Sequence, residues 1–262
     1  MLIVGGIVAG SLLGARLTAA TSGAVVTVVA LDPPDPDRDQ RLGLAFVSVL
    51  LLYFQLLATG LAVATGVVEE KTSRVVEVLL STVKPLHLLV GKVVGIGVVG
   101  LVQLLAYGVV GLGAALLTGT VTITGTAVAV VAATLGWFVL GYAFFAVLYA
   151  AAASLVSRQE EVGGVTAPLT VLVIGMFLLA QGTAQDPSGT VSSVASWVPP
   201  FSAILMPLRI AAGVAGPAQV VGTVVLMAVV TAGLAVASAS VYRRSVLRSG
   251  TRVPWREALR RG

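Results

Sequence analysis

Long apolar runs separated by short charged segments dominate the hydropathy pattern of this chain. Extended stretches without charged residues cover 42–68, 93–157, 162–185 and 218–242. A membrane-spanning helix needs about 20 mostly apolar residues, and the run 93–157 is too long for one. It divides at 118–126, where threonine and glycine predict a turn or a short extended piece. The pattern therefore predicts five spanning helices, at about 42–68, 93–117, 127–156, 162–184 and 218–242.

Composition agrees with an all-α, polytopic integral membrane helix bundle. The 262 residues are 57% hydrophobic and 10% charged, whereas a soluble domain carries about 25% charged residues. So few charges cannot cover a water-soluble globule, which excludes a soluble enzyme. The chain has no cysteine and one histidine, His87, so disulfides, cysteine nucleophiles and histidine-paired metal or triad chemistry are excluded. We therefore expect no catalytic residue, cofactor site or metal site.

The segment 1–41 has two interpretations. Its residues 1–31 are apolar but interrupted by Arg16, and an arginine at the bilayer centre costs roughly 2.5–3.5 kcal/mol on insertion scales. One interpretation is a poor additional span, which would give six in all. The other is the end of an extracytoplasmic domain, with an upstream part and a first span that this chain lacks. The β-branched stretch 24–31 resembles a strand more than the centre of a span, which favours the second interpretation.

Basic residues are concentrated on one predicted side of the membrane. The segments after the first and third predicted spans and the tail 246–262 hold most of them, although the net charge is only +5. Because cytoplasmic loops carry an excess of lysine and arginine, segments 69–92 and 157–161 and the C-terminus are predicted to be cytoplasmic. This placement at span ends indicates a bilayer as the partner and not a nucleic acid.

The longest charged connector inside the membrane region, 69–84, predicts an amphipathic helix at the cytoplasmic interface that ends at Pro85. At 100° per residue, Glu70, Arg74, Glu77 and Ser81 share one stripe, opposite an apolar stripe. Glu70 and Arg74, four residues apart, are predicted to form an ion pair. The helix either rests its apolar face on the bilayer or forms a docking surface for a cytoplasmic partner. Its mixed charge favours docking. The candidate docking residues are Glu69, Glu70, Lys71, Arg74, Glu77 and Ser81.

Several further positions are candidates for transport. Gln55, Gln103 and Tyr107 are polar groups inside spans that either line a substrate path or form interhelical hydrogen bonds. Pro168 is predicted to kink the fourth span and is a candidate hinge. The proline-rich segment 185–217 is too broken for a span and suits a partly re-entrant external cap. Its candidate residues are Trp197, Pro200, Phe201 and Arg209.

Two segments resemble one family of membrane proteins. GVVEEKTSRVVEVLLSTVKPLHLLVGK (66–92) and WVPPFSAILMPLRIAAG (197–213) are similar to segments of the permease subunits of ABC-2-type exporters, particularly the sodium-export-like branch. The resemblance covers about 42–245. It implies a six-span half-transporter of the bacterial cytoplasmic membrane that pairs with itself or a similar permease subunit and with separate ATP-hydrolysing subunits. Segment 69–84 would be the coupling helix, and 1–41 departs from the pattern.

The predicted function is therefore a permease subunit that moves an unidentified substrate outward, with ATP hydrolysed by another subunit. The chain lacks a G-x-x-x-x-G-K-[ST] phosphate-binding loop, so it is not expected to be an enzyme. Mid-span ionisable groups, which proton- and ion-coupled carriers use, are absent from the five predicted spans. An ATP-independent transporter or channel and a non-transporting membrane scaffold are the alternatives.

Overall fold

The computed structural model describes residues 17–18, 25–26, 38–72, 85–119 and 125–245. The chain divides into two compact units, Met1–Arg38 and Asp39–Gly262. In the first unit, strands β1 (Leu17–Thr18) and β2 (Val25–Val26) pair antiparallel, with Leu17 opposite Val26. Strand β2 lies within the stretch 24–31 that resembles a strand in sequence. The rest of that stretch lies outside the described residues.

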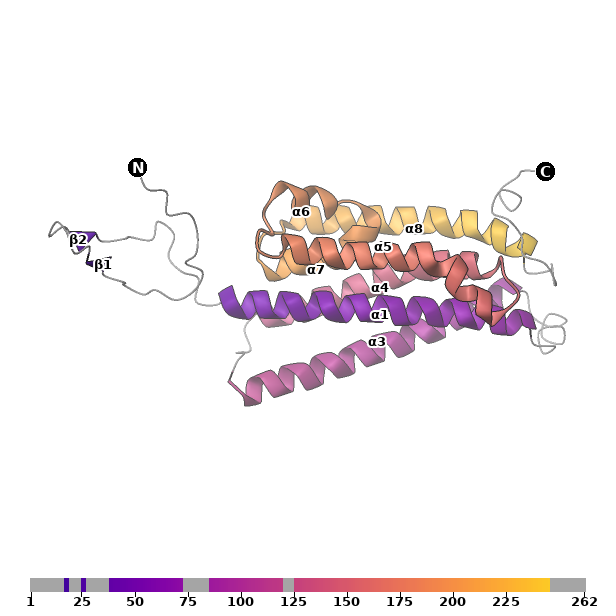
Figure 1. The fold of residues 1–262 in the computed structure, drawn as a ribbon, viewed down its shortest axis with the longest axis horizontal. Helices are drawn as coiled ribbons and strands as arrows, with labels where there is room; N and C mark the ends of the chain where they lie inside the picture. The colour runs from indigo at the N-terminus through magenta and orange to yellow at the C-terminus, as the bar shows by residue number, and fades with distance from the viewer. Residues whose placement is uncertain (1–16, 19–24, 27–37, 73–84, 120–124, 246–262) are drawn as a thin grey trace. The chain divides into compact units, whose positions relative to one another are not determined.

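The second unit is a bundle of helices (Figure 1). Its elements are α1 (Arg38–Thr72), α3 (Pro85–Leu117), α4 (Gly125–Ala153), the 3-10 helix η1 (Gln159–Glu161), α5 (Val162–Thr183), α6 (Thr190–Ala195), α7 (Pro199–Ala211) and α8 (Pro217–Ser245). Within the described part of the chain, five helices are long and apolar enough to cross a membrane: Gln40–Glu70, Val90–Leu117, Ala127–Ala153, Gln159–Thr183 and Pro217–Ser238. These correspond to the five predicted spans, and the protein is an all-α, multi-pass membrane protein.

The bundle has two ends, which we name after residues of α1. At the Gln40 end, α1 begins, α3 finishes and the short helices α6 and α7 lie; at the Glu70 end, α1 finishes, α3 begins and η1 lies (Figure 1). Helix α1 continues to Thr72. The first residues assigned to the separate amphipathic helix 69–84 are therefore the last turn of α1, and residues 73–84 lie outside the described residues.

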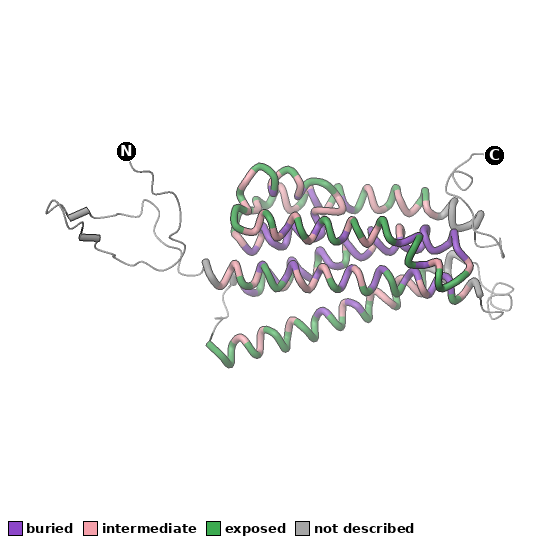
Figure 2. Tube along the Cα trace, viewed as in Figure 1, coloured by how far each residue is buried: buried purple, intermediate pink, exposed green. Residues whose placement is uncertain are grey.

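Helix α4 is the centre of the bundle. It packs against α3, α5, α7 and α8. Half of the most apolar 18-residue stretch of α4 is buried inside the protein, compared with 11% of the corresponding stretches of α3 and α8. Four buried aromatic side chains recur along it at helical spacing: Phe138, Tyr142, Phe145 and Tyr149. Residues three and four apart share one face of a helix, so this aromatic face forms the core. Buried positions concentrate along α4, whereas α3 is mostly exposed (Figure 2).

The proline-rich segment forms two short helices, and the longer one is deeply packed. Pro199 and Pro200 begin α7, where a missing N–H costs no helical hydrogen bond. Residues Ser202–Arg209 are all buried, against α4, α5 and α8. Thirteen residues at 1.5 Å each reach about 20 Å, less than the roughly 30 Å hydrocarbon core. Helix α7 is thus too short to span a bilayer, and its role as an external cap stays a prediction.

Candidate functional site

The first helical hairpin, α1 and α3, is fastened at the Glu70 end by what we call the Lys92 junction, formed by Lys92, Glu70 and Gly66. Lys92 Nζ lies 2.6 Å from Glu70 Oε1 and donates a hydrogen bond to the carbonyl oxygen of Gly66 at 2.7 Å. A Cβ on Gly66 would lie 2.9 Å from the Lys92 side chain, so glycine makes room for the lysine stem. The junction ties the start of α3 to the last turns of α1.

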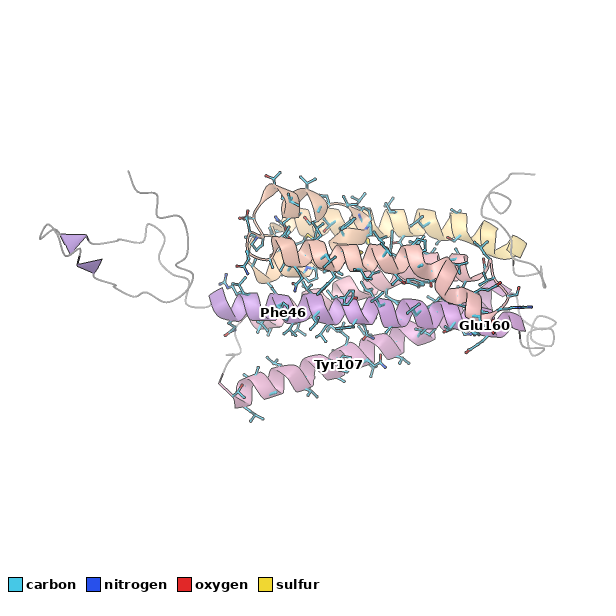
Figure 3. The ribbon with its side chains drawn as sticks, viewed as in Figure 1. Phe46, Tyr107 and Glu160 are labelled. Atoms are coloured by element: carbon cyan, nitrogen blue, oxygen red, sulfur yellow. The ribbon has the colours of Figure 1, made fainter. Side chains whose placement is uncertain are left out.

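The loop after α4 is fastened to the same part of α1. Gln159 Nε2 donates to the carbonyl oxygen of Thr65 at 3.1 Å. This contact holds η1, with the acidic residues Glu160 and Glu161, beside the final turns of α1, where Figure 3 labels Glu160. Described residues of the two segments predicted to be cytoplasmic, 69–92 and 157–161, therefore lie at the same end of α1.

The structure places part of the predicted docking surface at this end. Glu69 is exposed and Glu70 is half-buried on the last turn of α1, where the backbone of Lys71 also lies. Arg74, Glu77 and Ser81 lie outside the described residues, as does the predicted Glu70–Arg74 pair. Sequence reasoning missed Lys92 as the partner of Glu70, although its position as the one charged residue at the start of a long apolar run was a signal.

Midway along the hairpin, α1 and α3 are joined by a glutamine layer formed by Gln55, Gln103 and Gly100. Gln55 Nε2 donates to the carbonyl oxygen of Gly100 at 3.0 Å and to Gln103 Oε1 at 3.1 Å. A Cβ on Gly100 would lie 2.8 Å from Thr59 and 2.9 Å from Phe138, so the helices approach closely here. The structure thus shows interhelical hydrogen bonds for both glutamines, one of the two interpretations of these residues. Their role in a substrate path stays a prediction.

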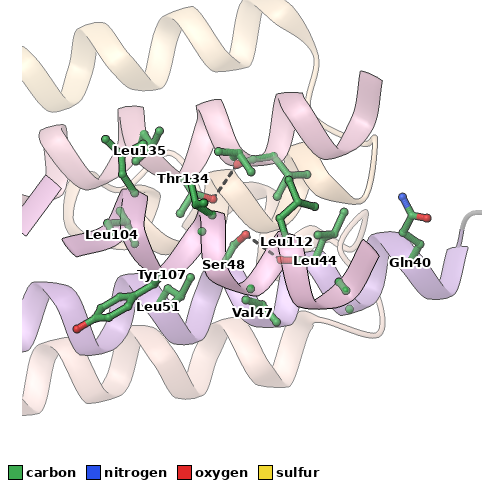
Figure 4. Close-up of a pocket in the computed structure, with 18 residues that line it drawn as sticks. Gln40, Leu44, Val47, Ser48, Leu51, Leu104, Tyr107, Leu112, Thr134 and Leu135 are labelled. Atoms are coloured by element: carbon green, nitrogen blue, oxygen red, sulfur yellow. Dashed lines mark hydrogen bonds between the residues drawn. The ribbon is translucent and has the colours of Figure 1, made fainter. Parts of the chain in front are cut away.

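Beyond the glutamine layer, α3 diverges from α1 toward the Gln40 end (Figure 1). A cavity of about 540 Å³ opens between α1, α3 and α4, which we call the hairpin cavity (Figure 4). Tyr107, the third candidate for a substrate path, lines it and is 52% exposed. The other lining residues are mostly leucine, valine and glycine. Across the described residues, no three acidic or histidine side chains lie close enough together to hold a metal ion.

The external-cap candidate Arg209 is the centre of a buried polar cluster, which we call the cap network. Its side chain is 4% exposed and donates to the carbonyl oxygen of Pro187, to Ser192 Oγ at 3.5 Å and to Gln219 Oε1 at 3.3 Å. Gln219 Nε2 in turn donates to Ser196 Oγ at 2.8 Å. Burial lowers the pKa of the Arg209 guanidinium. The network joins α7, α6, α8 and the turn after α5, and Gln219 is a member that sequence reasoning missed.

The remaining candidates lie in α5, in α7 and just before α7. Trp197 lies over Gly222 of α8, where an added Cβ would come within 2.7 Å of the indole ring. Phe201 packs against the main hydrophobic core, and Pro200 is in the first turn of α7. Pro168 lies inside α5, which stays helical from Val162 to Thr183. Its role as a hinge stays a prediction.

Comparisons with known proteins agree with this architecture. The family model described as ABC-2 family transporter protein matches residues 11–239. The chain is 30% identical over 188 residues to uncharacterized protein YhaP of Bacillus subtilis strain 168, covering 67% of this chain and 44% of that protein. It is 27% identical over 169 residues to uncharacterized protein MJ1024 of Methanocaldococcus jannaschii, covering 63% and 40%. The chain thus spans less than half the length of these relatives. No solved structure matches it significantly.

The family match extends over most of the chain and includes all of the second unit except its C-terminal part. It agrees with the five apolar helices and with both segments in which the sequence resembles exporter permeases. Such permeases normally work with an ATPase partner. This multi-pass membrane protein belongs to the ABC-2 family of ABC transporter permeases.

Proposed function

We propose that this chain is the permease part of an ABC exporter, which moves its substrate outward when a separate subunit hydrolyses ATP. The Glu70 end would face the cytoplasm, together with the C-terminus, in a bacterial inner membrane. Motion of the ATPase subunit would enter through segment 69–84. The permease would act as a pair with itself or with a similar subunit. Kinship with the sodium-export-like branch stays a prediction and does not by itself set the substrate.

The Lys92 junction is the observation that supports this proposal most directly. A push on segment 69–84 acts on the last turn of α1, and the junction passes it to α3 through the 2.6 Å contact between Lys92 and Glu70. The contact between Gln159 and Thr65 passes it to the loop before α5. Rigid, packed elements carry displacement because protein interiors are dense and barely compressible. One input would thus move three helices, as switching between two arrangements requires.

The test separates the coupling surface from the junction. Reversing the charge of Glu70 would also break its pair with Lys92, so the informative variant is Glu69→Lys with Glu77→Lys. We expect this variant to reach the membrane and keep its fold, yet to lose most of the ATPase stimulation that transport substrate or permease binding produces. The measurement is the ATP hydrolysis rate of the co-purified complex in proteoliposomes.

The matched control is Asp186→Lys, an exposed charge reversal at the opposite end of the bundle. It should leave the ATPase rate unchanged. Full coupling in the Glu69→Lys, Glu77→Lys variant would contradict the proposal. Transport that continues without any ATPase subunit would instead favour the ATP-independent alternative.

A further inference from the structure

The hairpin cavity is closed at one end by the glutamine layer. Leu51 and Leu104 line the cavity. Gln55 lies four residues after Leu51 on α1, and Gln103 lies one residue before Leu104 on α3. The next turn toward the Glu70 end therefore holds the bonded pair Gln55–Gln103, packed around Gly100. A molecule that enters between α1 and α3 from the Gln40 end would stop at this layer.

Two hydroxyl groups of the cavity already donate hydrogen bonds within their own helices. Ser48 Oγ donates to the carbonyl oxygen of Leu44 at 2.8 Å, and Thr134 Oγ1 donates to that of Val130 at 2.7 Å (Figure 4). Tyr107 directs its hydroxyl away from both (Figure 4). Because each hydroxyl donor of Ser48 and Thr134 is bonded, the interior of the cavity offers a ligand mainly apolar surface.

Among the described residues that line the cavity, none is Asp, Glu, Lys, Arg or His. An ion that enters such a site loses its water shell, and without charged partners or several free oxygen ligands the loss is not offset. A sodium ion is therefore a poor occupant. A volume of about 540 Å³ lies within the range of about 300–1,000 Å³ typical of small-molecule pockets, which are also lined mainly by apolar side chains.

We propose that the hairpin cavity binds an uncharged, largely apolar small molecule that enters from the bilayer, and that this is the class of substrate that the exporter moves. The second half of this statement rests on the proposed function; binding itself does not. The geometry would also permit gating, since the side-chain hydrogen bonds and ion pair between the described parts of α1 and α3 lie at the Lys92 junction and the glutamine layer, and the cavity lies beyond both.

Two glycines allow the cavity to be filled without disturbing its walls. Gly108 and Gly111 of α3 line it, and a Cβ on either would meet no atom within 4 Å. The test variant is Gly108→Leu with Gly111→Leu. The matched control is Gly113→Leu, on the same helix, which has equal space but does not line the cavity.

The probe is the uncharged apolar dye Nile red, titrated into the 262-residue chain in lipid nanodiscs without an ATPase subunit, with empty nanodiscs subtracted. We expect saturable binding by the wild type and by Gly113→Leu, and a loss of affinity of about tenfold or more in the double variant because its leucines occupy the space. Binding of radioactive sodium should show no component that the double variant removes.

Equal dye binding by the double variant and the wild type would overturn the proposal. So would a saturable sodium component that the double variant removes. Native mass spectrometry covers the remaining occupants: a phospholipid held by the wild type, lost in the double variant and not displaced by Nile red would make the cavity a lipid site. A dimer that the double variant breaks without weaker dye binding would make it a contact between copies. Each of these results leaves the coupling proposal standing, because no ATPase subunit is present.

Discussion

The two ends of the α1–α3 hairpin differ in how the helices meet. At the Glu70 end, α3 is held by the Lys92 junction and by the hydroxyl of Tyr142, which donates to the carbonyl oxygen of Val93 at 2.5 Å. At the Gln40 end, the same helix diverges and leaves the hairpin cavity. Polar contacts thus concentrate where force would enter, and open apolar space lies where a substrate would bind. A hairpin fastened at one end can open at the other without losing its register.

Some helices at the Gln40 end are tightly packed, although α3 is not. While α3 diverges there, α7 is packed deeply and the cap network joins it to α6 and α8. At the Gln40 end, the tight packing is therefore found around α7, whereas at the Glu70 end it is found between α1 and α3. Each of the following variants challenges one side of this difference, and free energies of unfolding refer to the purified chain titrated with SDS from mild detergent.

The largest expected effect comes from filling the closest approach of the hairpin. Gly100→Leu should lower the free energy of unfolding by about 3 kcal/mol, because overpacking at a site with neighbours on two sides forces side chains and backbone apart. Gly111→Leu, on the same helix at the open end, should change it by no more than about 0.5 kcal/mol. Equal effects of the two substitutions would remove the distinction between the tight and open halves.

The cap network is tested by Arg209→Met. This variant should lower the free energy of unfolding by about 2 kcal/mol, because the partly buried carbonyl oxygen of Pro187 and side chain of Gln219 lose their donor. Arg209→Lys retains one donor and should fall between the variant and the wild type. An unchanged or higher stability of Arg209→Met would show that the desolvation cost of the guanidinium outweighs its hydrogen bonds.

The Lys92 junction is tested by a double-mutant cycle with Glu70→Gln and Lys92→Met. The coupling energy between the two should be about 1 kcal/mol, since a half-buried pair is worth more than an exposed one but is still partly screened. The cycle also removes contributions from any other contacts of either residue. A coupling energy indistinguishable from zero would mean that the 2.6 Å contact does not hold the hairpin.

The smallest expected effect is a gain. Gly113→Ala should raise the free energy of unfolding by about 0.5 kcal/mol, because alanine favours the helix and its Cβ meets no neighbour. Gly97→Ala is the comparison at the tight end, where the Cβ would lie 2.6 Å from the ring of Tyr142, and it should destabilise. A loss of stability in Gly113→Ala would indicate that the added Cβ meets a group where the structure leaves open space.

Much of the fold could be predicted from the sequence because membrane insertion imposes a local requirement. The five spans were found to within a few residues at most ends, since about 20 apolar residues must be contiguous to cross the hydrocarbon core. The proline-rich segment was also distinguished from a span. The burial of α7 in the bundle was not predicted, because its prolines indicate where the helix begins but not which helices it packs against.

The candidate site was only partly predictable, for a physical reason that Lys92 illustrates. Helical periodicity pairs residues three or four apart, so it connected Glu70 to Arg74. The pair between Glu70 and Lys92 joins two helices, and its existence depends on where α3 crosses α1. Gln55 and Gln103 were recognised as polar groups in spans, but their mutual bond required the same information.

The sequence by itself predicted the five helices that are long and apolar enough to cross a membrane in the described part of the chain. It also determined where the charges gather and which family the chain resembles, because each of these follows from residues close together along the chain. Only the tertiary structure decided that Gly97 and Gly100 are packed while Gly108 and Gly111 face open space. The four glycines lie on one helix with similar spacing, and no local rule separates them. What separates them is the crossing of α1, α3 and α4, which brings side chains distant in sequence to the first pair and none to the second.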